Sequence, residues 1–274
     1  MDPLSTLLAH TAPRAELFFA GNLCQNSHSH DYPVGGHLHL LHSGELFLYR
    51  EGAEPCLLTE PSLLLFPGGL PHRMEPRQLG GCELVCATVS FGVWASSPLK
   101  LALPDALVLP LRELPVLEPL LHLLFDEAFT ERYGRESALT RLLELLLILL
   151  LRYMVECGLC QQGMLAGLSD PRLAKAISAM HLRSEEEWTV MTLAQEAGMS
   201  RARFAAHFQA LTGMPPLGYL TRWRMALACE QLVAGESIAQ TALAAGYSGS
   251  VAFSRAFERE LGLSPGRWLK AQQQ

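Results

Sequence analysis

The 274-residue sequence lacks a long apolar run. The longest, Leu145–Leu151, has seven residues and lies between Glu144 and Arg152, whereas a helix that spans a membrane needs about 20. The first residues also lack a basic stretch followed by an apolar one, so we expect no secretory signal, no membrane partner and a cytoplasmic protein. Charged residues are few, at 18% against 49% hydrophobic residues, which excludes an intrinsically disordered chain.

The number of cysteines in the sequence, seven, is odd. An odd number without a secretory signal argues against a framework of structural disulfides, so most thiols are expected to be buried small side chains. Cys157 and Cys160 form a Cys-x-x-Cys pair, but neither a thioredoxin-like βαβ pattern nor a second pair accompanies it, and we interpret it as packing. The seven are Cys24, Cys56, Cys82, Cys86, Cys157, Cys160 and Cys229.

The net charge changes sign along the chain. Residues 1–168 hold 10 basic and 18 acidic residues, whereas residues 169–274 hold 11 and 9. This shift predicts a domain boundary near Gly167–Pro171. The small positive balance after it is weak evidence for a nucleic-acid partner by itself.

Residues 17–110 have the pattern of a β-rich domain. Short apolar or alternating runs at Leu46–Tyr49, Leu63–Phe66 and Cys82–Phe91 are separated by glycine-containing turns, as is typical of a sandwich or barrel. Residues 113–131 and 137–156 then predict two helices. The second is leucine-rich around most of its circumference, so it either packs against both the barrel and a second subunit or is an ordinary core helix.

The C-terminal third contains a repeat. The first copy begins at Leu193 and the second at Thr241, 48 residues later, and the offset becomes 49 after a Gly-x-Ser turn. In each copy this turn is followed by two phenylalanines four residues apart and then by Gly-x-x-Pro. The pattern predicts two helix-turn-helix units, at residues 189–211 and 237–261. The repeated positions are Gly198 and Gly246, Ser200 and Ser248, Phe204 and Phe253, and Phe208 and Phe257.

Local signals agree with these two units. The glycine of each turn can adopt the left-handed conformation that ends a helix, and the serine after it can cap the next one. Thr189 and Ser237 are suited to cap the first helices, and Ser237–Gln240 fits a capping box. Leu217–Leu232 predicts one connecting helix that holds the two second helices in fixed register, as needed for successive major-groove faces about 34 Å apart.

On these residues the C-terminal part resembles the AraC/XylS family of transcriptional regulators. The resemblance implies binding to double-stranded DNA at promoter half-sites, activation or repression of transcription, and RNA polymerase as a partner. It rests on Leu193-Ala194, Gly198–Ser200, Phe208, Gly213, Tyr219-Leu220, Arg224, Ala228, Ile238-Ala239, Ala242, Gly246-Tyr247, Phe253–Phe257 and Gly262–Pro265.

The side chains expected to face DNA lie opposite the phenylalanine pairs. The alanines among them can touch a thymine methyl group but cannot hydrogen-bond to base edges, whereas Arg255 is suited to a bidentate contact with guanine. Arg201, Arg222, Arg224 and Arg259 are expected to meet phosphates or to form helix salt bridges. The predicted DNA-binding residues are Arg201, Ala202, Arg203, Ala205, Ala206, Gln209, Ser250, Val251, Ser254 and Arg255.

The N-terminal half resembles the cupins. His28-Ser-His30 is followed by His37, and Pro67–His72 matches a Pro-x-Gly-x-x-His motif. The resemblance implies that His28, His30, His37 and His72 hold one divalent metal, either Zn, Fe or Ni. The alternative is a metal-free effector pocket.

The predicted fold is therefore a two-domain α+β chain, with an N-terminal cupin β-barrel, a helical dimerisation segment and a C-terminal all-α double helix-turn-helix. We place the sensor domain at residues 1–112 and the helical pair, through which a homodimer is expected, at residues 113–160. The linker is placed at residues 161–170 and the DNA-binding domain at residues 171–274.

A closer resemblance is to the members of this family that respond to reactive chlorine species. It rests on Met1–Leu8, Ala12-Pro13, Cys24, Pro71–Arg73, Val85–Thr88, Trp188–Val190, Met199–Ala202 and Phe204-Ala205. It implies that Cys24 and Cys86 sense hypochlorous acid. Histidines near Cys24 could lower the pKa of its thiol, and Cys82, on the same strand face as Cys86, is an alternative resolving thiol.

The leading hypothesis is a transcription regulator that responds to oxidation, and activation is the expected direction of regulation. A metal or a small metabolite in the barrel is the alternative signal. A metal-cupin enzyme fused to a DNA-binding domain is a second class of function, and a constitutive DNA-binding protein with an inert cupin is a third. Since the sequence shows no separate general acid–base constellation, we expect no enzymatic activity.

Overall fold

The computed structural model describes residues 3–10, 13–33, 35–91, 103–160 and 162–271. They fall into two compact units. We call residues 13–91 and 103–154 the barrel unit, and the described parts of residues 1–12 and 155–274 the helical unit. Within the described residues, no helix combines the length and apolar character needed to cross a membrane.

The barrel unit is built from two antiparallel sheets. One has the strand order β1-β8-β3-β6-β9 and the other has the order β2-β7-β4-β5. The three strands predicted from apolar runs are confirmed as β4, β6 and β8. The strands are β1 (Pro13–Leu23), β2 (Ser27–His28), β3 (Gly36–Ser43), β4 (Leu46–Arg50), β5 (Cys56–Leu58), β6 (Ser62–Phe66), β7 (His72–Pro76), β8 (Cys82–Phe91) and β9 (Leu107–Pro110).

Alternating side chains of these strands fill the space between the sheets. Leu46 and Leu48 on β4, Leu64 and Phe66 on β6 and Leu84 on β8 are all fully buried in one core. Residues two apart on a strand point to the same face, so each strand contributes every second side chain to this core.

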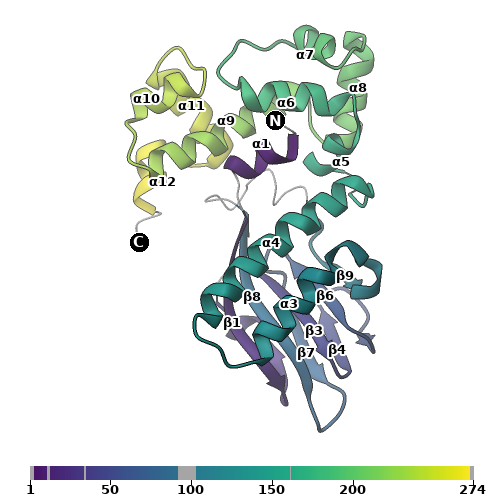
Figure 1. Cartoon of the computed structure of the whole chain (residues 1–274). Coiled ribbons are helices and arrows are strands. Elements are labelled where there is room, and N and C mark those ends of the chain that lie inside the picture. Colours follow the sequence, from purple (N-terminus) through teal and green to yellow (C-terminus); the bar gives the residue numbers. More distant parts are fainter. Residues whose placement is uncertain (1–2, 11–12, 34, 92–102, 161, 272–274) are drawn as a thin grey trace. The chain divides into compact units, whose positions relative to one another are not determined.

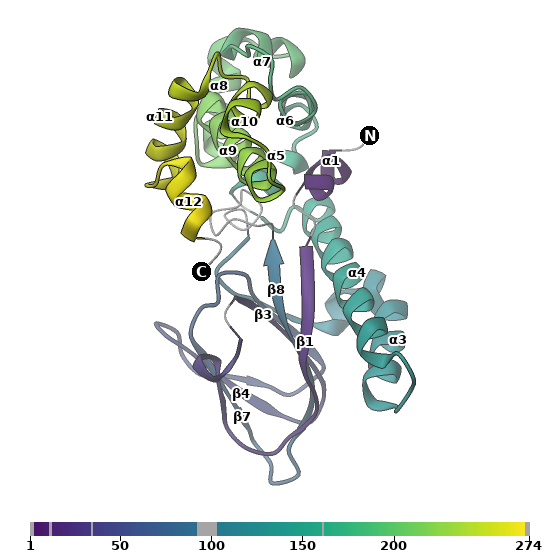
Figure 2. The same ribbon diagram turned by 90° about the vertical axis from the view of Figure 1, so that its left-hand side faces the viewer.

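Two helices cover the outer face of the five-stranded sheet, α3 (Glu118–Phe129) and α4 (Arg135–Glu156) (Figures 1 and 2). The ring of His42 on β3 lies 4.3 Å from that of Phe125 and 5.4 Å from that of Phe129. The first helix begins later than predicted. Residues 111–117 form two 3-10 turns, η2 (Leu111–Glu113) and η3 (Pro115–Leu117), since proline cannot donate the hydrogen bond of a helix interior.

The helical unit contains both halves of the sequence repeat. The connecting helix α9 runs between the two groups of helices in Figure 1, with α6, α7 and α8 on one side and α10, α11 and α12 on the other. The helices are α1 (Pro3–His10), α5 (Met164–Ser169), α6 (Leu173–Leu182), α7 (Val190–Glu196), α8 (Arg201–Thr212), α9 (Pro216–Val233), α10 (Ile238–Ala244), α11 (Ser250–Leu261) and α12 (Pro265–Ala271).

The segment predicted as the linker, residues 161–170, contains a short helix. Met164–Ser169 forms α5, whose residues Met164–Leu168 are buried. The backbone N–H of Gly163 donates to the carbonyl of Leu211 at the end of α8, at 2.9 Å. A helix of six residues is too short to show a periodic pattern in the sequence.

The N-terminal helix α1 belongs to the helical unit, although its residues lie within the predicted sensor domain. It packs against α6, and Leu7 is fully buried. The sequence offers no signal for this placement, because the contact joins segments more than 160 residues apart in the chain.

Candidate nucleic-acid interface

The two helix-turn-helix units are α7 with α8 and α10 with α11. We call α8 and α11, the second helix of each unit, the reading helices. Gly198 and Gly246 in the turns have φ values of 61° and 74°, which confirms the predicted left-handed turns. Thr189 and Ser237 cap α7 and α10, and both form capping boxes.

The caps of the reading helices differ from expectation. Ser200 is the N-terminal cap residue of α8, but its side chain makes no capping hydrogen bond. Gly249 replaces Ser248 as the cap residue of α11. The second turn is one residue longer than the first, and the extra residue moves the start of the helix past the serine.

Each reading helix has one buried and one exposed face. Phe204 and Phe208 on α8, and Phe253 and Phe257 on α11, are fully buried. The predicted DNA-binding residues lie on the other side. Arg201, Ala202, Arg203, Ala206, Gln209, Ser250, Val251 and Arg255 are exposed, and Ala205 and Ser254 are half-buried.

The exposed arginines of the reading helices are available to a ligand. Within the described residues, Arg201, Arg203 and Arg255 take part in no ion pair, whereas Arg259 pairs with Glu260 at 3.3 Å. The two faces differ in chemistry. Besides its arginines and Gln209, α8 offers three alanines, whereas α11 offers two serines, Val251 and Arg255.

A hollow of about 600 Å³ lies beside α8 and is lined in part by Arg172, Arg203 and Ala206. At its edge, Nε2 of His207 lies 2.7 Å from Oδ2 of Asp170. Burial raises the pKa of Asp170, but hydrogen bonds from His207 and from the backbone N–H groups that start α6 outweigh it, so the net pKa is lowered. The side chain of Asp170 thereby ties α8 to the start of α6, a contact that the sequence analysis missed.

The four predicted metal ligands and His39 separate into an inner and an outer group. Within the barrel, His37, His39 and His72 are 0–5% exposed, and Nε2 of His39 lies 2.9 Å from Nε2 of His72. His28 and His30 are more exposed. Their rings lie 5.0 Å apart, and His30 pairs with Asp31 at 3.3 Å.

Two backbone carbonyls show which ring nitrogen of His72 and of His37 carries a hydrogen. Nδ1 of His72 donates to the carbonyl of Leu70 at 2.7 Å, so its neutral ring accepts at Nε2 from Nε2–H of His39. Nε2 of His37 donates to the carbonyl of Pro33 at 3.0 Å. Within the described residues, the buried Nδ1 atoms of His37 and His39 then have no partner.

Burial favours the neutral forms of His39 and His72 by lowering the pKa of each ring. Burial, followed by His72 and His37, lowers the pKa of His39 well below its ordinary value. Burial also lowers the pKa of His72 to about 4; the carbonyl of Leu70 opposes this shift and His37 adds to it.

The four predicted metal ligands do not converge, which corrects that prediction. In the part of the chain that the structure describes, no group of three or more His, Cys, Asp or Glu side chains could hold a metal ion. The 3-10 turn η1 (Ser29–Asp31) places His30 at the surface, while His39, not predicted as a ligand, takes a place in the inner cluster. Its alternation with His37 on β3 was the sequence signal for this position.

The two predicted sensor cysteines lie apart along the sheet. Cys86 on β8 pairs with Phe19 of β1, whereas Cys82 pairs with Leu23, the residue before Cys24. Five positions of a strand separate Phe19 from Cys24, roughly 16 Å, and a disulfide needs Cα atoms within about 7 Å. Of the two buried thiols of β8, Cys82 is therefore the one near Cys24.

The three thiols also differ in exposure. Cys24 is exposed, whereas Cys82 and Cys86 are buried. Burial, and then Cys24, raise the pKa of Cys82 to about 11. Burial, and then Cys82, raise the pKa of Cys86 further. Since the thiolate is the reactive form, neither buried thiol is suited to react first.

The sequence and the structure were also compared with known proteins. A family model described as Cupin matches residues 2–156, and one described as Helix-turn-helix domain matches residues 193–271. The DNA-binding domain of AdpA, solved in complex with a target DNA, is 34% identical and covers 37% of this chain and 92% of its own, with a TM-score of 0.34.

Two relatives match to different extents. A putative AraC-like transcription regulator of Streptomyces lividans is 46% identical over 109 residues, which are 39% of this chain and 36% of that protein, so the match spans about a third of its length. The RCS-specific HTH-type transcriptional activator RclR of Escherichia coli K12 is 29% identical over 280 residues, 98% of this chain and 97% of that protein. With the cupin model matching more than half of the chain and the repeat folded as two helix-turn-helix units, the chain belongs to the AraC family of helix-turn-helix regulators that have an N-terminal cupin domain.

Proposed function

We propose that this protein is a sequence-specific DNA-binding transcription regulator whose cupin domain receives the signal. One observation carries the proposal: each reading helix buries its two phenylalanines on one face and exposes residues that are expected to contact DNA on the opposite face. RNA polymerase is the partner that regulation at a promoter requires.

Direct base readout is assigned to the second unit. Arg255 is exposed on α11 and has no ion-pair partner in the described chain, so its guanidinium is free for a bidentate contact with guanine O6 and N7. The first unit has alanines at the matching face, and these can touch thymine methyl groups but cannot hydrogen-bond to base edges.

Replacing Arg255 by alanine tests this assignment. The variant should bind the site selected by the native protein about 1–3 kcal/mol more weakly, and it should lose preference at one base pair only. Affinity is measured for the selected duplex and for each of its single base-pair variants. Arg259→Ala, four residues along the same helix, is the matched control and should leave the preference among base pairs unchanged. An equal loss on every sequence for Arg255→Ala would show that Arg255 meets a phosphate.

The favoured signal is oxidation by reactive chlorine species, with Cys24 and Cys86 as the predicted sensing residues. The exposure of Cys24 supports it as the first site of attack. Hypochlorous acid would oxidise the Cys24 thiol to a sulfenic acid and leave as chloride and a proton. A second thiol would then condense with the sulfenic acid, forming the S–S bond and releasing water. The strand register favours Cys82 over Cys86 as that second thiol.

Peptide mapping by mass spectrometry after one equivalent of hypochlorite tests this signal. We expect selective oxidation of Cys24, reversal by dithiothreitol, and a Cys24–Cys82 crosslink that Cys82→Ala abolishes and Cys86→Ala retains. A crosslink that instead requires Cys86 would restore the original pair. If Cys24 stays reduced, or if all seven cysteines react alike, oxidation is not the signal.

The segment 113–160 is proposed to form a homodimer. Val116, Leu123 and Leu145 are 57%, 51% and 43% exposed in it, which is unusual for large apolar side chains in one region. Sedimentation of the double variant Leu123→Glu/Leu145→Glu is expected to show a monomer, while the native chain sediments as a dimer. The control pair Glu131→Gln/Glu136→Gln should remain dimeric. A native monomer would remove the proposal.

One observation favours a small metabolite as an alternative signal. The inner histidines have two buried Nδ1 atoms without partners in the described residues, and a ligand with two donor groups would satisfy both. The proposed metal lacks such support because its predicted ligands do not converge.

A further inference from the structure

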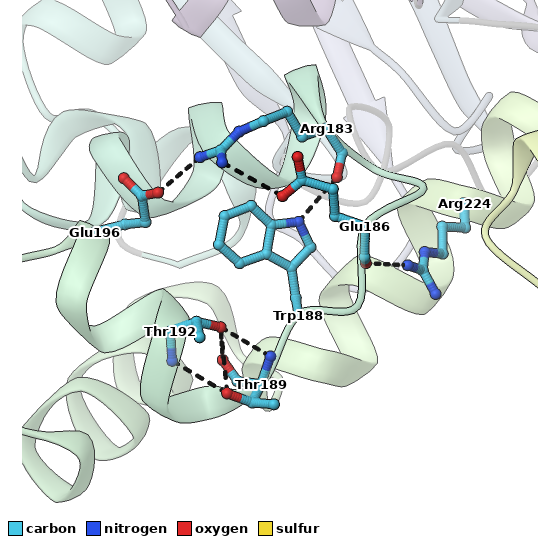
Figure 3. A network of polar contacts seen from close by, with 7 residues as sticks. All are labelled: Arg183, Glu186, Trp188, Thr189, Thr192, Glu196 and Arg224. Atoms are coloured by element: carbon cyan, nitrogen blue, oxygen red, sulfur yellow. Dashed lines mark hydrogen bonds and ion pairs between the residues drawn. The ribbon is translucent and has the colours of Figure 1, made fainter.

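The segment between α6 and α7, Arg183–Thr189, is folded tightly onto the first helix-turn-helix unit (Figure 3). We call it the bridging loop. Nε1 of Trp188 donates to the carbonyl of Arg183 at 2.9 Å, and Cζ of Arg183 lies 4.7 Å from the centre of the Trp188 ring. Arg183 also bonds to Glu196 of α7 at 2.6 Å. The loop and α7 therefore hold each other in place.

Arg224 of the connecting helix α9 bonds to the backbone of this loop. Its Nε donates to the carbonyl of Ser184 at 2.6 Å. Its Nη2 donates to the carbonyl of Glu186 at 2.7 Å, the bond drawn in Figure 3. The planar guanidinium can satisfy two carbonyls at once, which the single ammonium of lysine cannot do with the same geometry. Arg224 is half-buried, and burial lowers its pKa.

The turn of the second unit also lies against the bridging loop. Gly246 has a φ of +74°, and a Cβ at this position would lie 2.6 Å from the carbonyl oxygen of Glu185 and 2.8 Å from Nη2 of Arg224. The next residue, Tyr247, has its ring centre 5.9 Å from Cζ of Arg224. The Tyr247 ring also lies 5.7 Å from that of Phe253 on α11. Contacts thus continue from α7 through the bridging loop and Arg224 to the second reading helix.

Arg224 was expected to meet a phosphate or to form a helix salt bridge, and these contacts show that it instead bonds to backbone carbonyls. Two of its donor groups already bond to carbonyls inside the helical unit. Arg222, two residues earlier on α9, is exposed and, within the described residues, makes no ion pair. The two arginines are therefore a matched pair with different surroundings.

We propose that Arg224 is a positioning residue that holds the two reading helices at one separation and so sets the spacing of DNA segments that the protein accepts. The proposal rests on the proposed DNA binding. One inserted base pair moves the second segment by about 3.4 Å along the duplex and turns it by about 34°, since about 10.5 base pairs make one turn. A rigid pair of units cannot follow this change, whereas a loosened pair can.

The test uses the full-length protein and a duplex selected by it from a randomised library. Affinities are measured for this duplex and for versions with one base pair inserted or removed between the two bound segments. We expect the native protein to lose about tenfold or more on insertion, and Arg224→Gln and Arg224→Lys to lose less than about threefold. Arg222→Gln should keep the native discrimination.

The salt dependence of binding separates positioning from a phosphate contact. Removing a phosphate contact lowers the slope of log affinity against log salt by about one. We expect this lower slope for Arg222→Gln and the native slope for Arg224→Gln. A lowered slope for Arg224→Gln, with Arg224→Lys behaving as the native protein, would overturn the proposal, as would native spacing discrimination in both Arg224 variants.

Two further outcomes are distinguishable. If circular dichroism shows that Arg224→Gln is not folded, the spacing test is made with Arg224→Lys, because lysine retains the charge and the aliphatic stem. If the native protein selects no sequence from the library, the proposed DNA-binding function has failed, rather than the role of Arg224.

Discussion

Alanine in place of Phe257 is expected to lower the free energy of unfolding of the helical unit by about 3–5 kcal/mol. Phe257 is fully buried, and its ring lies 5.5 Å from that of Phe253 and 5.8 Å from that of Trp268. The substitution opens a cavity where α11 packs against α12, in the core that also contains Ala242 of α10 and Met225 of α9. The placement of α11, and so the second DNA contact, depends on this core.

Urea unfolding followed by tryptophan fluorescence measures the effect, since Trp268 lies in the same core. Val251→Ala is the control on the same helix. Val251 is 67% exposed, so its loss should change the free energy by no more than about 0.5 kcal/mol. Equal effects of the two substitutions would mean that α11 does not pack through its phenylalanine face.

The barrel unit is expected to lose stability as the pH falls from 6.5 to 4. The pKa of His72 is lowered from 6.5 to about 4 in the folded protein. In this window the unfolded chain binds more protons than the folded chain, so acid favours unfolding. A shift of this size corresponds to about 3 kcal/mol of the free energy of unfolding. The barrel unit has this contribution in full above pH 6.5 and has lost it by pH 4. The lowered pKa of His39 acts in the same direction.

Hydrogen exchange of peptides from β3 and β6 in increasing urea, at several pH values, measures the stability of the barrel by itself. His72→Gln should flatten the dependence between pH 6.5 and 4. His30→Gln should leave it as in the native chain, because the side chain of His30 is 75% exposed. A native dependence in His72→Gln would show that other groups cause the acid sensitivity.

Features that depend on neighbouring residues could be predicted from the sequence. The turns at Gly198 and Gly246, the cap at Ser237 and the buried phenylalanine pairs each follow from a few adjacent positions. The connecting helix predicted at Leu217–Leu232 is observed as α9, Pro216–Val233. Repetition of the same pattern 48–49 residues later made the fold of this part recognisable before any contact was known.

Features that depend on the register of distant segments could not be predicted. The pairing of Leu23 with Cys82 brings Cys24 close to one buried thiol and away from another. A 3-10 turn removes His30 from the histidines of the barrel. The bonds of Arg224 join α9 to a loop about 40 residues earlier, and nothing in the local sequence distinguishes this arginine from the exposed Arg222.

Footprinting of the full-length protein on a DNA site selected from a randomised library tests the central claim most directly. Two bound reading helices predict two protected major-groove segments on one face of the duplex, centred about 10.5 base pairs apart. Arg255→Ala should weaken protection at one of them and leave the other in place. Protection of a single segment, or uniform protection of unrelated sequences, would contradict the account.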